Sequence, residues 1–207
     1  MSKLTTNPRP PKSVRDELRR AEIVAGAREC VVRHGFHAAS MAEISAATQL
    51  SVGQIYRYFP SKEAIIEAIV LQIVERKIAR VSGKSDEAQF PRELALRTVE
   101  DADGDDQKLL LDATAEATRN PAVAEIVRRA DRALHDRIRE FFRARFPAMS
   151  EAQARARVEV LAVLVDGTRA RKVTDPVADP QVLELLYVDV LEMLFPLPAP
   201  PHVLPPA

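Results

Sequence analysis

A cluster of hydrogen-bonding side chains between Gln54 and Lys62 has the chemistry needed to hold a nucleic acid. Arg57 can donate to a phosphate or read a guanine, and Gln54 can read an adenine if its amide is not used in capping a helix. The hydroxyls of Tyr56 and Tyr58 suit phosphate contacts. Lys62 adds a charge at a helix N-terminus, where backbone N–H groups also attract phosphate. The cluster predicts contacts with both the backbone and the bases of DNA.

Three serines mark the helices that must position this cluster. Ser40 is followed at the third position by Glu43 and Ser51 by Gln54, which is the pattern of a capping box. Ser61 can cap a further helix. Two short helices joined by a turn of a few residues are typical of a helix-turn-helix, whose second helix enters the DNA major groove. We expect helices over residues 15–34, 41–48, 52–58 and 62–81.

The predicted helix over 52–58 has an apolar face and an outward face. At 100° per residue, Ile55 and Phe59 fall opposite Gly53 and Arg57. A helical glycine costs about 1 kcal/mol relative to alanine, so we interpret Gly53 as a point where a DNA strand approaches the backbone. Core aromatics and ordinary surface charges remain the alternative for each residue alone. The predicted DNA-contacting residues are Ser40, Ser51, Val52, Gly53, Gln54, Tyr56, Arg57, Tyr58 and Lys62.

The stretch from about residue 23 to residue 65 resembles the DNA-binding domain of the tetracycline repressor (TetR) family. The family usually has glycine at the turn position that Gln49 occupies, so we expect Gln49 to adopt a less favourable backbone or the turn to differ slightly. The resemblance implies a homodimeric, ligand-responsive transcriptional regulator, joined through its two C-terminal helices. The matching residues are Ile23, Ala27, Gly35, Phe36, Ser40, Met41, Ile44, Ser51, Val52, Gly53, Tyr56, Tyr58, Phe59, Ser61, Lys62 and Glu63.

Charge is unevenly distributed along a chain of 207 residues whose formal net charge is zero. Up to Lys62 there are ten basic and five acidic residues, so this part carries a surplus of positive charge that the remainder balances. The asymmetry places nucleic-acid affinity near the N-terminus. The proline-rich arm before the first helix can track phosphates or a minor groove, or it can be a simple disordered terminus.

The apolar residues recur at helical spacings, without convincing strand alternation, which predicts an all-α fold. Three later helix starts are marked by Asn120-Pro121, Ser150 with Gln153, and Asp179-Pro180. We expect a break between domains at 82–86 and a turn at 103–105. The predicted organisation is a disordered basic arm (1–14), a three-helix helix-turn-helix DNA-binding domain (15–62), a helical ligand-binding and dimerisation domain (63–195) and a proline-rich tail (196–207).

Several function classes are disfavoured. The chain has no apolar run long enough for a membrane span and no secretory h-region, so we expect a cytoplasmic protein. Cys30 falls on an apolar helix face and is interpreted as a buried hydrophobe rather than a redox sensor. His34 and His37 have no further metal ligand nearby, and no catalytic triad is recognisable. We therefore expect no cofactor, no metal and no enzyme; a helical ligand-binding dimer without DNA affinity is the alternative.

The last two predicted helices are apolar on more than one side, which favours a second copy as the cover, although central helices of a monomer would show the same pattern. The predicted interface residues are Val158, Leu161, Val165, Val182, Leu186 and Val190. A dimer would present two heads to a palindromic operator in double-stranded DNA. An unidentified small-molecule effector is implied by the resemblance; its candidate pocket residues, each of which could equally be a surface or ion-pair residue, are Thr114, Glu116, Arg119, His135, Phe142, Asp166 and Arg169.

Overall fold

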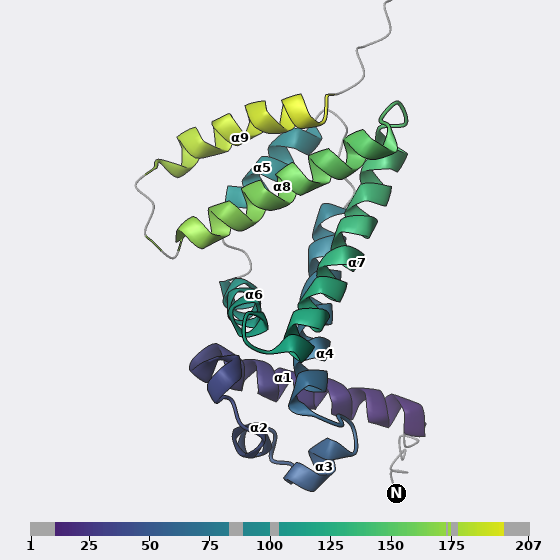
Figure 1. Ribbon diagram of the computed structural model, residues 1–207, viewed down its shortest axis with the longest axis vertical. Helices are drawn as coiled ribbons and strands as arrows, with labels where there is room; N and C mark the ends of the chain where they lie inside the picture. Colours follow the sequence, from purple (N-terminus) through teal and green to yellow (C-terminus); the bar gives the residue numbers. More distant parts are fainter. Residues whose placement is uncertain (1–10, 83–88, 100–103, 173, 175–177, 197–207) are drawn as a thin grey trace, which may run out of the picture. The chain divides into compact units, whose positions relative to one another are not determined.

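All regular structure in the described residues is α-helical, which confirms the predicted fold class (Figure 1). The computed structural model describes residues 11–82, 89–99, 104–172, 174 and 178–196. The predicted arm up to residue 10, the tail from residue 197 and most of the predicted break at 82–86 lie outside these ranges. The helices are α1 (Lys12–Ala38), α2 (Met41–Thr48), α3 (Val52–Tyr56), α4 (Lys62–Val81), α5 (Phe90–Val99), α6 (Gly104–Ala117), α7 (Pro121–Arg145), α8 (Glu151–Lys172) and α9 (Pro180–Leu194).

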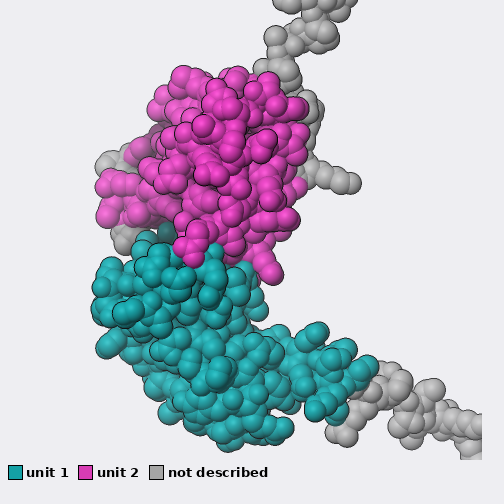
Figure 2. Space-filling view, turned by 45° about the vertical axis from the view of Figure 1, so that its right-hand side comes forward, with its two compact units in different colours: residues 1–73, 105–130 teal, residues 74–104, 131–207 magenta. Residues whose placement is uncertain are grey.

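The helices pack into two compact units, coloured separately in Figure 2. The first unit combines the chain up to Ile73 with residues 105–130, and the second combines residues 74–104 with the chain from Asp131 onward. Helices α4 and α7 each contribute residues to both units, so neither unit is one continuous stretch of chain. The functional boundary predicted at residue 62 stays a prediction.

The predicted helix starts are present with their capping hydrogen bonds. Ser40 and Glu43 form a reciprocal capping box, in which the Ser40 N–H donates to Glu43 Oε2 at 2.7 Å and the Glu43 N–H to Ser40 Oγ at 3.2 Å. This bond to the Ser40 N–H is the main reason that the pKa of Glu43 lies below its ordinary value. Asn120 caps α7 and Asp179 caps α9 through their side-chain oxygens. Local sequence therefore encodes where these helices begin.

Three predicted boundaries were wrong. Helix α1 starts at Lys12, inside the predicted arm. Its helical geometry is interrupted after His34 as predicted, by the φ of 79° at Gly35, and a short further segment continues to Ala38. Helix α3 ends at Tyr56 instead of residue 58, because the next residues form tighter bonds to carbonyls three residues back. The turn predicted at 103–105 is also wrong where it is described: Gly104 and Asp105 open α6, whose acidic first turn complements the helix dipole.

The first unit is built around the buried face of α1. Ile23, Ala27 and Ile55 are fully buried, and Phe36 and Phe59 are nearly so. Cys30 is buried too, as predicted, and burial raises the pKa of its thiol, which favours the protonated form.

Two acidic side chains of α6 fasten that helix to α1. Asp106, only 7% exposed, places Oδ1 2.5 Å from Nη2 of Arg28. Asp112 accepts a hydrogen bond from the Phe36 N–H, immediately after the interruption at Gly35. These polar contacts directly connect α1, a helix of the predicted DNA-binding domain, with a helix of the predicted ligand-binding domain.

Replacing Asp106 by asparagine is expected to lower the free energy of unfolding by about 1–3 kcal/mol, because the largely buried Arg28 loses a charged acceptor. Urea unfolding measures the change. Asp105→Asn is the matched control, since Asp105 is well exposed and, within the part of the chain that the structure describes, lies 3.7 Å from Lys108. Equal effects of the two substitutions would show that the Arg28–Asp106 pair contributes nothing specific.

The core of the second unit is an aromatic cluster. Phe142 is fully buried, its ring centroid lies 3.9 Å from that of Phe195, and Phe90 meets it edge-on at 5.7 Å. Buried Val158 and Leu161 of α8 join the same core, and Thr168 of α8 shares a hydrogen bond with Tyr187 of α9. Among the described residues, no helix is both long and apolar enough to cross a membrane.

Candidate nucleic-acid interface

The turn between α2 and α3 adopts the backbone that its sequence implied. Gln49 takes a left-handed conformation, with φ 55° and ψ 27°, and is the one non-glycine residue with positive φ in the described part of the chain. The prediction of a less favourable backbone at Gln49 is confirmed. The hydroxyl of Ser45 donates to the Leu50 carbonyl and so ties the end of α2 to the turn. This turn sets the direction in which α3 leaves α2.

The N-terminus of α3 is fixed by its own side chains. The Ser51 N–H donates to Gln54 Oε1 at 2.8 Å, and the Gln54 N–H donates to Ser51 Oγ at 3.2 Å. The amide oxygen of Gln54 is therefore engaged in capping, so the condition for a bidentate adenine contact is not met in this conformation. The NH₂ group of Gln54 and the hydroxyl hydrogen of Ser51 can still donate to an acceptor.

The outward face of α3 matches the predicted pattern. Gly53, Gln54 and Arg57 are exposed, while Ile55 is fully buried. A Cβ at Gly53 would meet no atom within 4 Å, so packing within the chain does not require a glycine there. The absence of a side chain instead leaves the backbone open to an external partner.

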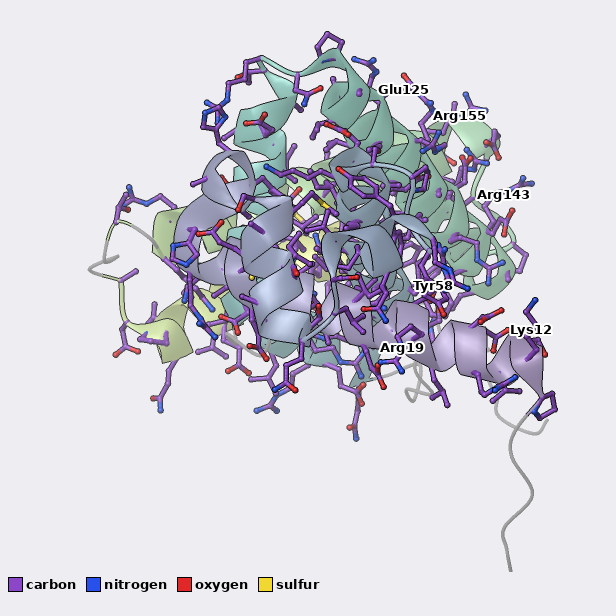
Figure 3. The ribbon with its side chains drawn as sticks, turned by 90° about the horizontal axis from the view of Figure 1, so that it is seen from below. Lys12, Arg19, Tyr58, Glu125, Arg143 and Arg155 are labelled. Carbon is purple, nitrogen blue, oxygen red and sulfur yellow. The ribbon has the colours of Figure 1, made fainter. Side chains whose placement is uncertain are left out.

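The two tyrosines differ in exposure. Tyr56 is 48% exposed, which excludes a core role for it, whereas Tyr58 and Val52 are half-buried. Figure 3 shows this side of the first unit, with Lys12 and Arg19 on α1 and Tyr58 just after α3. The candidate interface thus combines hydroxyl, amide and guanidinium donors on one short helix and its flanks.

Lys62 stands at the start of α4 and has an internal contact. Its Nζ donates to the His37 carbonyl at 3.2 Å, which joins the end of α1 to the start of α4. Ser61 caps the same helix start, since its Oγ accepts from the Ala64 N–H at 3.2 Å. Lys62 is half-buried, so its side chain is still partly accessible to a partner outside the chain.

Three of the predicted pocket residues lie in the first unit, at the end of α6 and just beyond it. Glu116, 8% exposed, pairs with Arg119 at 2.7 Å and lies 3.8 Å from His37 Nδ1. Thr114 is exposed and donates to the Leu110 carbonyl within its own helix. An open cavity of about 530 Å³ also lies in this unit, but these three residues are not among those that line it. Its lining residues are Ala21, Ala25, Arg28, Glu29, Val32, Arg33, Gln72 and Asp105.

The other four pocket candidates lie in the second unit. Phe142 belongs to the aromatic core, and His135 lies 3.3 Å from Asp131 Oδ1 and 3.7 Å from Glu159 Oε2. Asp166 lies between two cations, 3.8 Å from Lys77 Nζ and 3.8 Å from Arg169 Nη1. The contacts of His135, Asp166 and Arg169 are ion pairs, one of the alternatives considered from sequence, whereas Phe142 packs in the core. An effector pocket among them stays a prediction.

The structure revises the predicted dimer surface on α8. Val158 and Leu161 are 2% and 4% exposed because they pack into the core of their own unit. Val165 is half-buried against the same core. The exposed apolar side chains of this helix are Val160 and Val163. They lie about half a turn round the helix from the predicted residues. Because apolar residues occur on more than one side of this helix, its sequence does not show which side is buried.

The predicted surface on α9 agrees better with the structure. Val182 and Leu186 are 55% and 56% exposed, and Val190 is half-buried. Leu185 and Met193, which were not predicted, are 64% and 73% exposed. Exposure of so many large apolar side chains on one helix indicates a surface that another molecule covers.

Two family models match the chain. The model for bacterial regulatory proteins of the tetR family matches residues 23–69, and the model for the C-terminal part of BetI-type transcriptional repressors matches residues 92–196. The transcriptional regulator UidR of Escherichia coli K12 is 34% identical over 142 residues, which cover 67% of this chain and 68% of UidR.

More distant relatives cover almost the whole chain. The regulator BetI of Burkholderia mallei is 24% identical over 192 residues, which are 87% of this chain and 97% of BetI. Among solved structures, GusR of Salmonella enterica superposes with a TM-score of 0.71 at 25% identity, over 86% of this chain and 95% of GusR. The similarity therefore extends through both the N-terminal and the C-terminal helices.

Proposed function

This chain belongs to the tetR family of bacterial regulatory proteins, and from that premise we propose how it regulates transcription. We propose that it binds a palindromic operator as a homodimer, with α3 of each copy in the major groove, and that a small-molecule effector releases it. The observation that best supports this function is the outward face of α3. A capping box fixes the start of the helix, Gly53 leaves its backbone accessible, and the Arg57 side chain that follows is exposed.

The proposed contacts divide into two kinds. Arg57 is the candidate for base reading, because its side chain is exposed and a guanidinium can donate to the edge of a guanine. Ser40, Ser51, Tyr56, Tyr58 and Lys62 are candidates for phosphate contacts, since a hydroxyl or an ammonium can donate to the DNA backbone. Because the amide oxygen of Gln54 accepts the capping bond, its side chain is a candidate for one donated hydrogen bond to DNA rather than for a bidentate contact with adenine.

The proposed dimer surface comprises one stripe on α8 and one on α9. On α9, Val182, Leu186 and Met193 follow each other at helical spacing and are exposed. On α8, exposed Val160 and Val163 continue towards Gly167, where a Cβ would meet nothing within 4 Å. A second copy related by a two-fold axis would cover both stripes and bring two DNA-binding heads to two half-sites.

The proposed effector response needs a difference in affinity between two states. An effector releases the operator only if it binds the DNA-incompetent conformation better, and the difference in its affinity limits the effect. The contacts of Asp106 and Asp112 with α1 support α6 as the element through which such a change reaches the head. A role in binding the effector for Glu116, Arg119 or the other candidates remains part of this proposal.

Selection of random duplex DNA by the purified chain, at two salt concentrations, tests the proposed function. We expect recovery of one palindromic motif whose binding weakens steeply as salt rises. Recovery of no motif from folded, dimeric protein would favour the alternative of a ligand-binding dimer without DNA affinity. The motif also provides the operator for the measurements below.

Arg57→Ala is expected to weaken binding to the selected operator by about 1–3 kcal/mol if Arg57 reads a base. The preference at one position of each half-site should relax at the same time, and competition with single-base variants of the operator measures both changes. Arg128→Ala is the control, because Arg128 is an exposed arginine of α7 that pairs with Glu125 at 3.0 Å. An unchanged isotherm for Arg57→Ala would remove this residue from the interface.

A further inference from the structure

Helix α3 is too short to hold its own orientation. It has five residues, and only a few backbone hydrogen bonds close its end, including those from the Tyr58 and Phe59 N–H groups to the Ile55 carbonyl at 2.9 and 3.0 Å. A helix of this length is marginal by itself, so contacts with the rest of the unit must set its direction. Its first turn is held by the capping box of Ser51 and Gln54.

The other end of α3 is held by a side chain from α1. The guanidinium of Arg20 lies over the ring of Phe59, with Cζ 4.2 Å from the ring centroid. The same guanidinium donates through Nη1 to the Tyr58 carbonyl. Phe59 is 1% exposed, so the ring that Arg20 covers is itself fixed in the core.

Arginine is suited to both contacts at once. Its planar guanidinium can stack on an aromatic face while the N–H groups at its edge donate to an acceptor beside the ring. The last carbonyls of a helix and those just beyond it have no partner within that helix. A cation near the Tyr58 carbonyl, two residues past the end of α3, therefore satisfies a group that would otherwise need water. Arg20 thus contacts both the Phe59 ring and the Tyr58 carbonyl, which lie just beyond the end of α3.

We propose that Arg20 is a positioning residue for DNA recognition, rather than one of the basic residues that contact phosphate. This inference rests on the proposed DNA-binding function of α3. Tyr56 and Arg57 lie between the capping box at Ser51 and the contact of Arg20 with Tyr58. With both ends held, these two side chains face the groove in a fixed direction. Loss of Arg20 releases one end and lets the recognition side chains lose their alignment with the bases.

Hydrogen exchange of the free protein, followed by mass spectrometry, tests the hold on α3 without DNA. In Arg20→Ala, the amides of Tyr58 and Phe59 are expected to exchange about tenfold faster, as the loss of a charged hydrogen bond and a cation–π contact implies. Peptides from α8 and α9 should exchange at the wild-type rate, which shows that the variant is folded. Arg19→Ala is the matched control, because Arg19 is the exposed neighbour of Arg20 and, among the described contacts, pairs with Glu22 at 2.7 Å. Unchanged exchange at residues 58 and 59 would overturn the proposal.

Salt dependence of operator binding separates positioning from phosphate contact. A residue that neutralises one phosphate reduces the slope of log K against log salt by about one unit when it is removed. Arg20→Ala is expected to weaken specific binding by about tenfold while leaving that slope at its wild-type value, since the loss arises from misalignment and not from a lost ion contact. A slope reduced by about one unit would overturn the proposal.

Arg20→Lys gives the conservative comparison. Lysine keeps the charge, so a phosphate contact would survive, but its compact ammonium cannot cover the Phe59 ring and reach the Tyr58 carbonyl together. We expect Arg20→Lys to remain defective both in binding and in exchange, and full recovery of both would overturn the proposal. If the wild-type chain selects no DNA motif, the proposed function fails, while the exchange experiment still decides whether Arg20 holds α3.

Discussion

Leu186→Glu is expected to convert the proposed dimer into a monomer and to weaken operator binding by about 10²–10⁴-fold, the gain that two linked binding modules provide. Leu186 is 56% exposed at the middle of the α9 stripe, between Val182 and Met193. A two-fold axis puts the substituted residue into the interface twice, once from each copy. Each glutamate would lose its water without a matching cation, which costs several kcal/mol per charge.

The fold of each copy should survive this substitution, because Leu186 lies outside the buried core of its unit. Sedimentation velocity measures the mass of the particle, and a titration of operator DNA measures the affinity. Leu96→Glu is the matched control: Leu96 is a leucine of the same unit that is 39% exposed and belongs to α5, which contributes no residue to the proposed stripes. A Leu186→Glu protein that stays dimeric at micromolar concentration would remove α9 from the proposed interface.

The helix starts could be predicted because the atoms that make them are close in sequence. Ser40 with Glu43, Ser51 with Gln54, and Ser150 with Gln153 each satisfy backbone groups three residues away, and all three capping boxes are observed. The apolar side of this segment was equally local, since Ile55 lies in α3, Phe59 follows it four residues later, and both are buried. The backbone at Gln49 followed from the same kind of reasoning.

The contacts that connect distant parts of the chain could not be predicted in this way. Arg28 and Asp106 are 78 positions apart, and Arg20 and Tyr58 are 38 apart. Nothing in either local sequence distinguishes these arginines from ordinary surface charges. Composition counted Arg20 and Arg28 towards a basic DNA-binding end, whereas the structure gives each of them a partner within the chain. Charge counts therefore overstate how many basic residues are free to meet DNA.

The division of α8 between core and surface failed for a different reason. Its apolar residues surround much of the helix, so a helical wheel offers two acceptable phases. Packing against the aromatic core selects the phase that buries Val158 and Leu161 and exposes Val160 and Val163. Only the position of a neighbouring helix could have decided between the two.

Phe142→Ala is expected to lower the free energy of unfolding by about 3–5 kcal/mol, the cost of removing a large aromatic side chain from a closed core. Phe142 is 0% exposed, and its ring contacts the rings of Phe90, Phe141, Phe146 and Phe195, with centroid distances from 3.9 to 6.2 Å. Urea unfolding at one fixed protein concentration measures the loss, since the stability of a dimer depends on concentration.

Two roles of Phe142 make opposite predictions for this substitution. A residue that lines an empty effector pocket, as the sequence suggested, can be shortened at little cost in stability, and the main effect is then on the effector response. A residue that stacks on Phe195 at an interplanar angle of 11° leaves a cavity when shortened, and the whole unit loses stability. Phe141→Ala is the comparison, because Phe141 is only partly buried against the same cluster and should cost clearly less. If Phe142→Ala unfolds with nearly the wild-type free energy, Phe142 is a residue of the effector site. If the free energy of unfolding falls by several kcal/mol, Phe142 belongs to the core that supports α8 and α9 and, through them, the proposed dimer.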